Sequence, residues 1–169
     1  MNPDEVHWVV IYTKARAERK VVEALRDAAY EAFLPLRRER RKWSDRYKIV
    51  EFPLLPSYVF VRIPLRWVPK LYGTKGLAYV VKFGNEVAVV PDCQIEALRI
   101  MMQQDLQVRI QHTSLLKRHA NVVVTDGPLK GYSGTVVKDC SDGNFSINLE
   151  VLNYSFICTL DQTLLQVVD

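Results

Sequence analysis

The sequence lacks the features that mark several large protein classes. Its three cysteines, Cys93, Cys140 and Cys158, lie far apart with no paired spacing, so we expect neither a disulfide framework nor a clustered zinc site. Free thiols in a reducing, cytoplasmic compartment fit this usage. No apolar run approaches the ~18 residues that a membrane-spanning helix needs. The first residues, MNPDEVHW, lack the basic start and apolar centre of a signal peptide, and we expect no membrane contact.

Residues with catalytic chemistry are also scarce. His7, His112 and His119 have no cysteine, serine or carboxylate partners at a motif spacing. The glycine-rich run GPLKGYSG at residues 127–134 lacks the Lys-Ser/Thr pair, opening a helix, that a phosphate-binding loop requires. We therefore expect no metal, no cofactor and no enzymatic activity, and interpret the glycine-rich run as the corner of a β-structure.

Positive charge is concentrated in one segment. The net charge is +4, yet residues 36–48 hold seven basic against two acidic side chains, which is +5 for that segment alone. The remaining sixteen basic and seventeen acidic residues give −1. A local basic segment favours one electrostatic contact with a polyanion over a surface that is basic throughout.

The amino-terminal half alternates between strand and helix patterns. His7–Lys14 and Ser57–Ile63 have the period of two and the β-branched and aromatic composition of strands. Arg16–Phe33 contains an apolar stripe at helical spacing, followed by extended residues up to Pro35. Tyr47–Phe52 predicts another strand, so the basic segment is expected at the exposed tip of a long hairpin.

Residues beyond the hairpin continue this mixed pattern. Leu65–Tyr72 predicts a short, weakly helical connection, and Ala78–Lys82 and Val87–Val90 predict brief strands. Asp92 suits the N-cap of a further helix. The order of these elements predicts an α+β sandwich with helices packed on a mostly antiparallel sheet.

The carboxy-terminal part has a different pattern of periodicity from the amino-terminal half. Gln103–Arg118 has no clear period and predicts a linker with some helical content. From Asn121 onward, five short strand patterns fall within about fifty residues, with Asp142-Gly143 as a hairpin signal. This spacing predicts a small β-barrel.

The ordered motifs resemble one known family. Residues 122–134 resemble the KOW motif, and five segments are similar to the amino-terminal (NGN) domain of the NusG family: residues 8–14, 33–35, 55–61, 75–81 and 90–91. The resemblance spans His7 to Val168. It implies an NGN-type α/β sandwich at residues 1–104, a linker at 105–118 and a five-stranded, SH3-like KOW β-barrel at 119–169.

The resemblance also implies a function and its binding surfaces. Members of this family are non-enzymatic factors that ride on RNA polymerase, and their NGN domain receives the clamp helices of the largest polymerase subunit in an apolar depression. Carried over by position, this depression is lined by Tyr12, Leu55, Tyr58 and Phe60, although these residues could instead be plain sheet core. A second contact across the polymerase cleft falls on Leu65, Arg66, Trp67 and Lys70.

Some departures favour the specialised antiterminator paralogues of the RfaH and UpxY type. Ser57 replaces a common glycine, Ala120-Asn121 replaces Gly-Asp, and residues 152–155 replace a Phe-Gly-Arg turn. The resemblance implies a monomer that suppresses pausing and termination at selected operons through non-template DNA. The candidate nucleic-acid contacts are Lys14, Arg16, Arg40, Arg41 and Lys42, and the alternative is a solvated hairpin.

Two alternative functions remain at this point. The chain could be the general NusG elongation factor, whose KOW domain couples polymerase to a small-subunit ribosomal protein or to a termination factor. It could also be a KOW-containing ribosomal or RNA-binding structural protein. The segment from Asn121 onward carries −4, which is a poor surface for wrapping RNA and disfavours the ribosomal alternative.

Overall fold

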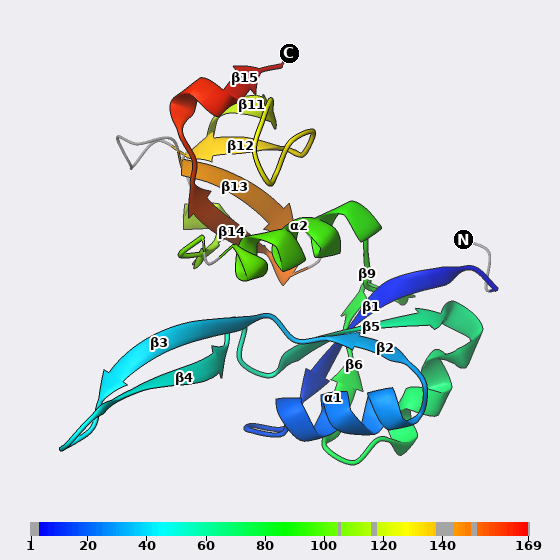
Figure 1. Ribbon diagram of the computed structural model, residues 1–169. Helices are drawn as coiled ribbons and strands as arrows, with labels where there is room; N and C mark the ends of the chain where they lie inside the picture. Colours follow the sequence, from blue (N-terminus) through cyan, green and yellow to red (C-terminus); the bar gives the residue numbers. More distant parts are fainter. Residues whose placement is uncertain (1–3, 105, 116–117, 138–143, 150–151, 169) are drawn as a thin grey trace. The chain divides into compact units, whose positions relative to one another are not determined.

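The computed structural model describes residues 4–104, 106–115, 118–137, 144–149 and 152–168. The chain divides into two compact units, Met1–Asp92 and Cys93–Asp169, which are described separately below (Figure 1). Within the described residues, helices and antiparallel sheets occur together, which confirms the predicted α+β class. No helix in this part of the chain is long and apolar enough to cross a membrane.

An antiparallel sheet forms the centre of the first unit. Strand β1 (Val6–Thr13) pairs from Val6 to Tyr12 with β5 (Tyr58–Pro64), so these two predicted strands are neighbours. Strand β2 (Glu31–Phe33) extends the sheet beyond β5. On the other side of β1 lie β6 (Leu77–Val80) and β9 (Val89–Val90).

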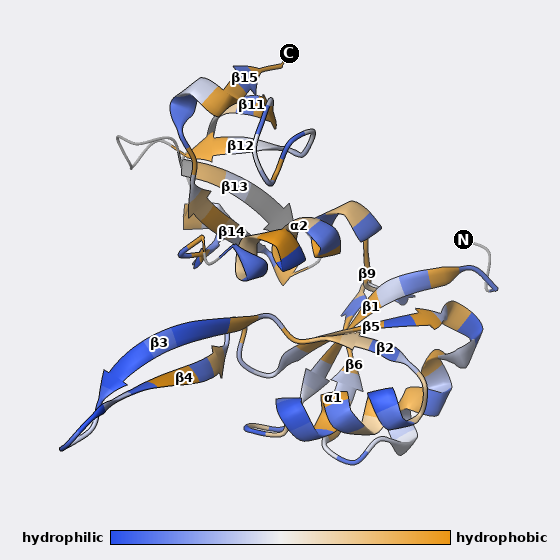
Figure 2. Cartoon of the chain, in the orientation of Figure 1, coloured by the Kyte–Doolittle hydropathy of each residue, from blue (hydrophilic) through white to orange (hydrophobic). Residues whose placement is uncertain are grey.

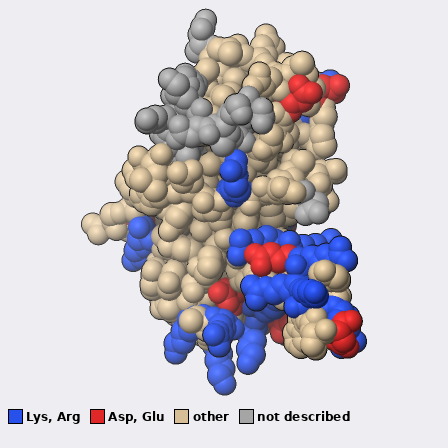
Figure 3. Space-filling view, turned by 90° about the vertical axis from the view of Figure 1, so that its left-hand side faces the viewer, with Lys and Arg blue, Asp and Glu red and all other residues tan. Residues whose placement is uncertain are grey.

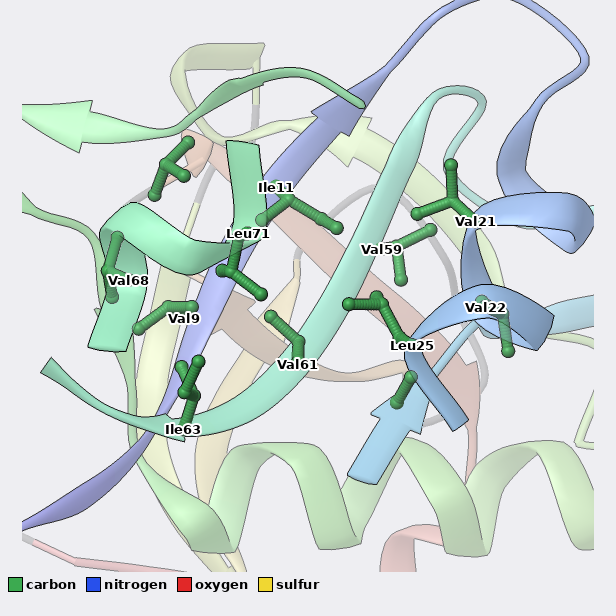
Figure 4. Close-up of a cluster of buried hydrophobic side chains, with 12 residues drawn as sticks. Val9, Ile11, Val21, Val22, Leu25, Val59, Val61, Ile63, Val68 and Leu71 are labelled. Carbon is green, nitrogen blue, oxygen red and sulfur yellow. The ribbon is translucent and has the colours of Figure 1, made fainter. Parts of the chain in front are cut away.

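One face of this sheet carries the hydrophobic core of the unit. Strand alternation places Val9, Ile11, Val59, Val61 and Ile63 on the same face, where all five are buried. Figure 4 shows these side chains together with those of two covering elements, helix α1 (Glu18–Asp27) and the 3₁₀ helix η1 (Leu65–Gly73). The side chains that α1 and η1 contribute are Val21, Val22, Leu25, Val68 and Leu71. The predicted amphipathic helix is thereby confirmed.

Helix α1 is shorter than the pattern indicated. It ends at Asp27, and Ala29 adopts a left-handed φ of 62° directly afterwards. A non-glycine residue in that region cannot continue a right-handed helix. The chain then enters β2, so the extended residues before Pro35 begin at Glu31.

The basic segment lies in a long β-hairpin, as predicted. Strands β3 (Leu36–Lys42) and β4 (Tyr47–Pro53) form a two-stranded sheet of their own, and the Trp43 N–H donates to the Arg46 carbonyl across the turn at 2.8 Å. The basic residues are not confined to the tip, because they make up most of β3 itself. Figure 2 shows β3 as hydrophilic along most of its length, whereas β4 carries hydrophobic patches.

A short two-stranded ribbon and a second helix come after η1 in the chain. Strands β7 (Lys82–Phe83) and β8 (Glu86–Val87) form a small ribbon joined through Gly84 and Asn85. Helix α2 spans Asp92–Gln103 and therefore begins at the aspartate that the sequence marked as its start. From Cys93 onward this helix groups with the second unit.

The second unit is a six-stranded antiparallel sheet with the order β10-β14-β13-β12-β11-β15. Its strands are β10 (Arg109–His112), β11 (Arg118–Val124), β12 (Ser133–Val137), β13 (Asn144–Leu149), β14 (Tyr154–Thr159) and β15 (Leu165–Val167). Two short 3₁₀ turns, Thr113–Leu115 and Gln162–Leu164, complete the described elements of this unit. The buried residues of the unit include Val122, Val124, Phe145 and Phe156.

Two expectations for this region change, and a third is not tested. Arg109–His112, within the segment predicted as a linker with some helical content, forms strand β10 and pairs with β14. The sheet has six strands, and no pairing among the described residues closes β10 onto β15, so the structure does not show a closed barrel. The predicted Asp142-Gly143 hairpin lies outside the described residues. The domain limits drawn from the sequence stay a prediction.

Candidate protein and nucleic-acid binding surfaces

Three tyrosines form a row across the sheet of the first unit. Tyr12 on β1 lies directly opposite Tyr58 on β5 and Tyr79 on β6. The rings of Tyr12 and Tyr58 meet edge to face with centroids 5.0 Å apart, and those of Tyr12 and Tyr79 stack at 4.9 Å with an interplanar angle of 11°. Such aromatic pairs stabilise one another and present a rigid apolar surface. We call Tyr12, Tyr58 and Tyr79 the tyrosine row.

The tyrosine row is open to solvent, whereas two other predicted contact residues are not. Tyr79 is 48% exposed, and Tyr12 and Tyr58 are half-buried. Leu55 and Phe60 are 3% and 0% exposed. Of the four predicted contact residues, Tyr12 and Tyr58 are therefore accessible, whereas Leu55 and Phe60 are core side chains. For Leu55 and Phe60 the structure agrees with the alternative that they are plain sheet core.

Tyr79 was not among the residues singled out from the sequence. Its strand was predicted, because Ala78–Lys82 has strand composition. The pairing of that strand with β1 joins residues more than sixty positions apart and is not encoded in any local period. The signal that could have indicated it is that Tyr79 is an aromatic residue within a predicted strand.

A buried corner fixes the positions of Tyr12 and Tyr58. Ser57, which precedes Tyr58, has a left-handed φ of 68°. Its N–H donates to Oε1 of Glu18 on α1 at 2.8 Å, and its carbonyl accepts from the Thr13 N–H at 2.8 Å. The corner thus joins α1, the end of β1 and the start of β5 beneath the tyrosine row.

The predicted second contact lies on η1. Trp67 is 37% exposed, with the Lys70 ammonium 4.4 Å and the Arg66 guanidinium 5.6 Å from its ring centroid. Arg66 also forms an ion pair with Asp4. Leu65 differs from these residues, because it is partly buried against the core of the first unit. Arg66, Trp67 and Lys70 consequently form a cationic surface around one aromatic ring.

The β3–β4 hairpin has two chemically different faces. Residues opposite each other across an antiparallel pair project to the same face, and the face alternates along each strand. The observed register therefore defines an Arg40 face with Arg38, Arg40, Lys42, Tyr47, Ile49 and Glu51, and an Arg41 face with Arg37, Glu39, Arg41, Lys48, Val50 and Phe52. The predicted contacts Arg40 and Lys42 lie together on one face, and Arg41 lies on the other.

Two of the three cations of the Arg41 face share one carboxylate, and the third, Lys48, lies 5.9 Å from the centroid of the Trp43 ring. Glu39 forms ion pairs with both Arg37, at 2.9 Å, and Arg41, at 3.4 Å. The Arg41 guanidinium also lies 4.5 Å from the centroid of the Phe52 ring. Glu39, Val50 and Phe52 are all half-buried. This face is occupied by contacts within the hairpin.

The Arg40 face is paired through Glu51 at its base, and toward its tip the turn of the hairpin holds one carboxylate, Asp45. At the base, Glu51 accepts from Arg19 of α1 and from Arg38, each at 3.3 Å. These two hydrogen bonds hold the pKa of the Glu51 carboxyl below its ordinary value. Toward the tip, the Arg40 guanidinium lies 4.1 Å from the centroid of the Tyr47 ring. No carboxylate in the described part of the chain forms an ion pair with Arg40 or Lys42.

The remaining candidate contacts, Lys14 and Arg16, lie in the loop between β1 and α1. Both are exposed, Arg16 has a φ of 61°, and the Lys14 N–H donates to the Gly76 carbonyl at 2.8 Å. Within the residues described, no hydrogen bond or ion pair joins this loop to β3 or β4. Figure 3 shows lysine and arginine side chains gathered over the part of the surface that carries the hairpin. A shared role for the loop and the hairpin stays a prediction.

Metal-binding groups do not gather anywhere in the part of the chain that the structure describes. No group of three or more histidine, cysteine, aspartate or glutamate side chains there is arranged to hold an ion. The accessible candidate surfaces described above are the tyrosine row, the Trp67 surface and the hairpin.

Comparisons with known proteins agree with the resemblance seen in the sequence. The model of the family described as "Transcription termination factor nusG" matches residues 6–99. A solved structure described as "Domain interaction in Thermotoga maritima NusG" is similar with a TM-score of 0.54 at 16% identity, covering 99% of each chain. A structure of the MjSpt4:Spt5 complex has a TM-score of 0.33 at 12% identity, covering 96% of this chain and 98% of the other. Because the family model spans more than half of the sequence, the chain belongs to the NusG family of non-enzymatic transcription factors.

Proposed function

We propose that the chain is a transcription elongation and antitermination factor whose first unit binds the clamp helices of the largest RNA polymerase subunit. The tyrosine row is the observation that carries this proposal. It lies on a sheet of a NusG-family chain, and its rings are stacked against one another yet accessible. Rigid aromatic anchors of this kind supply most of the binding energy in many protein interfaces.

Buried residues have a supporting role in this proposal. Leu55 and Phe60 are too enclosed to touch a partner, and they act by holding the strands that carry Tyr12 and Tyr58. The Phe60 ring lies 6.1 Å from that of Phe33 on the neighbouring strand β2. Two clamp helices docked on the tyrosine row would form a helix-on-surface interface of a recurring type.

The Trp67 surface is proposed as the contact on the other side of the polymerase cleft. Arg66 and Lys70 flank the Trp67 ring and give it a positive border. A ring with adjacent cations suits an acidic and partly apolar partner surface. A factor that holds both sides of the cleft keeps the clamp closed, which disfavours paused and terminating states.

We further propose that residues 119–169 act as a KOW domain. The supporting observations are the glycine-rich run at residues 127–134 and the antiparallel order of β11 to β15. Ser57 and Asn153, with φ values of 68° and 54°, occupy positions where the general factor favours glycine or a glycine-containing turn. These departures support a specialised paralogue that acts at selected operons, where Lys14, Arg16 and the hairpin contact non-template DNA. Coupling of the KOW domain to a small-subunit ribosomal protein or to a termination factor is the alternative.

Polymerase binding by surface variants tests the main proposal. Full-length protein with Tyr12→Ala, Tyr58→Ala or Tyr79→Ala is expected to bind core RNA polymerase at least tenfold more weakly than the parent protein. Tyr47→Ala is the matched control for binding to polymerase without nucleic acid, because this tyrosine is 57% exposed and lies on β4, outside the tyrosine row and the Trp67 surface. Circular dichroism and thermal unfolding establish that each variant is folded.

Transcription through a terminator measures the activity itself. Addition of the parent protein is expected to raise the fraction of run-through transcripts on a terminator-bearing template, and the tyrosine-row variants are expected to lose this effect. Folded variants that keep full polymerase binding would overturn the proposed surface. Increased termination in the presence of the parent protein would favour the general-factor alternative.

A further inference from the structure

We propose that the Arg40 face of the β3–β4 hairpin binds single-stranded nucleic acid by stacking an unpaired base on the Arg40–Tyr47 pair. The inference deepens the proposed nucleic-acid contact, assigns it to one face of the hairpin, and removes Arg41 from it. It also adds Tyr47 and Ile49, which the distribution of basic residues alone does not indicate.

The Arg40–Tyr47 pair provides a flat, cationic stacking surface. The two residues lie diagonally across β3 and β4, and the guanidinium carbon of Arg40 is 4.1 Å from the centroid of the Tyr47 ring. Tyr47 is 57% exposed and Arg40 is exposed. Nucleobases stack on both aromatic rings and guanidinium planes. The pair therefore supplies a platform that is already assembled in the free protein.

Each face carries three cations and one carboxylate, and the Arg40 face is favoured because its unpaired cations lie beside the exposed Tyr47 ring. Arg37 and Arg41 share the carboxylate of Glu39, and a phosphate bound at Arg41 would compete with that ion pair. Arg40 and Lys42 form no ion pair among the described residues. Their charges can neutralise phosphates without first losing a carboxylate partner.

The exposed apolar groups favour a single strand over a duplex. Ile49 lies directly opposite Arg40 and is 65% exposed, which adds an apolar side chain beside the stacking pair. In a duplex the flat faces of the bases are stacked on each other and are not available to stack on Tyr47. A protein that contacts only duplex phosphates therefore gains nothing from an exposed aromatic and apolar surface. An unpaired base can cover both the Tyr47 ring and Ile49, which removes apolar area from water.

The base of the hairpin is anchored in a way that leaves the tip free. Glu51 is bound by Arg38 of β3 and by Arg19 of α1, so its carboxylate is occupied by side chains of the first unit itself. This carboxylate is therefore partly neutralised at the base of the Arg40 face. The unpaired cations lie toward the turn, together with Tyr47.

Fluorescence anisotropy with labelled oligonucleotides tests the inference on the full chain. The probes are a 12-nucleotide DNA strand of mixed sequence, the RNA strand of the same sequence, and the DNA duplex. The parent protein is expected to bind the single strands more tightly than the duplex. Comparison of the DNA and RNA strands then identifies which of the two is the better ligand.

Matched variants on the two faces give the decisive comparison. Arg40→Ala and Arg41→Ala remove the same charge from adjacent residues of β3. Arg40→Ala is expected to weaken single-strand binding roughly fivefold or more and to reduce the salt slope by about 0.7. Arg41→Ala is expected to change the affinity less than about twofold, because Arg41 is bound to Glu39.

Tyr47 separates stacking from charge. Tyr47→Ala removes the ring without changing the charge and is expected to weaken single-strand binding roughly fivefold or more, with a smaller effect on the duplex. Tyr47→Phe keeps the ring and is expected to bind as the parent protein does. If Tyr47→Ala disturbs the hairpin, its circular dichroism and the loss of duplex binding will show it, and Tyr47→Phe still reports on the ring.

The inference is overturned by equal losses for Arg40→Ala and Arg41→Ala, by undiminished single-strand binding of Tyr47→Ala, or by a preference for the duplex. Its failure is distinguishable from that of the proposed function. Retained polymerase binding with no oligonucleotide binding rejects the hairpin inference alone. Retained polymerase binding by the tyrosine-row variants, together with face-specific DNA binding, rejects the proposed polymerase surface alone.

Discussion

Glu18 on α1 accepts a hydrogen bond from the backbone N–H of Ser57 at 2.8 Å, and both residues are buried, at 7% and 8% exposure. The bond provides a partner for the buried Ser57 N–H, which would otherwise be enclosed without one. Ser57 itself lies in the left-handed region, with φ at 68°. A carboxylate from a helix thereby stabilises a strained corner of the neighbouring sheet. Tyr58, the next residue, begins the strand that carries part of the tyrosine row.

Replacement of Ser57 by glycine tests the strain at this corner. A non-glycine residue in the left-handed region costs roughly 1–2 kcal/mol, whereas glycine adopts it freely. Because glycine also gains entropy in the unfolded chain, we expect Ser57→Gly to raise the free energy of unfolding by up to about 1 kcal/mol. Ser57→Ala is the control, since it keeps the strain, and it should not stabilise. Urea unfolding measures both variants, and a lower midpoint for Ser57→Gly would contradict the argument.

Local periodicity and composition explain which parts of the fold the sequence predicted. The amphipathic helix buries one face, so its apolar residues recur at helical spacing. The strands at His7–Lys14 and Ser57–Ile63 bury residues on both faces, and their β-branched and aromatic composition indicated them. The first unit could be outlined on this basis. Arg109–His112 has no such signal, because its four residues are polar or half-buried, and it is a strand through its pairing with β14.

The make-up of the candidate surfaces depends on strand pairing, which the local sequence pattern does not predict. Tyr79 joins Tyr12 through the register of β6 on β1, and Arg40 and Arg41 separate through strand alternation in the hairpin. Burial divided the predicted polymerase contacts in the same way, since Phe60 and Tyr58 lie on one strand at 0% and intermediate exposure. The family resemblance and the basic composition of the hairpin suggested these candidates apart from Tyr79, and tertiary position then decided which are accessible.

The ion pairs of Glu51 should make the base of the hairpin sensitive to acid. Hydrogen bonds from Arg19 and then Arg38 lower the pKa of Glu51 from its ordinary value of 4.5. A carboxyl whose folded pKa is depressed stabilises the folded state above its unfolded pKa, and this contribution is lost as the pH falls through the folded pKa. We therefore expect the hairpin base to loosen only below about pH 4.5.

An NMR titration of the Glu51 carboxyl carbon measures this effect. The parent protein should titrate below the ordinary glutamate range, and Arg19→Ala and Arg38→Ala should each raise the pKa of Glu51. Lys20→Ala serves as the control, because Lys20 is an exposed cation next to Arg19 that forms no ion pair with Glu51 among the described contacts. An unchanged Glu51 pKa in both arginine variants would contradict the assignment.

The two described cysteines should differ strongly in reactivity. Cys158 is 1% exposed, and burial raises the pKa of its thiol to about 12, whereas Cys93 is exposed. At pH 8 the buried thiol is ionised in about one molecule in ten thousand, and the thiolate is the reactive form. A brief treatment with iodoacetamide should therefore label Cys93 and leave Cys158 unmodified until the protein is unfolded. Peptide mapping by mass spectrometry measures both sites, and equal labelling in the native state would contradict the burial of Cys158.

Gly134 is required by close packing in the second unit. It lies on β12, and a Cβ atom at this position would meet the Phe145 ring and the Ser146 carbonyl oxygen, each at 2.5 Å. Phe145 is fully buried, and Ser146 is held through hydrogen bonds from its hydroxyl to the carbonyl of Thr135, at 3.0 Å, and with the hydroxyl of Thr135, at 2.8 Å. Neither neighbour can move without breaking the pairing of β12 with β13.

Gly134→Ala should consequently lower the free energy of unfolding of the second unit by about 1–3 kcal/mol or more. Gly73→Ala is the control, because a Cβ atom there meets nothing within 4 Å, and its effect should stay within about 0.5 kcal/mol. Hydrogen exchange resolves the two units separately, so the loss of protection in Gly134→Ala should appear in β11 to β14 while β1 and β5 keep theirs. Unchanged protection in β12 and β13 would show that the close approach of these strands at Gly134 is absent in solution.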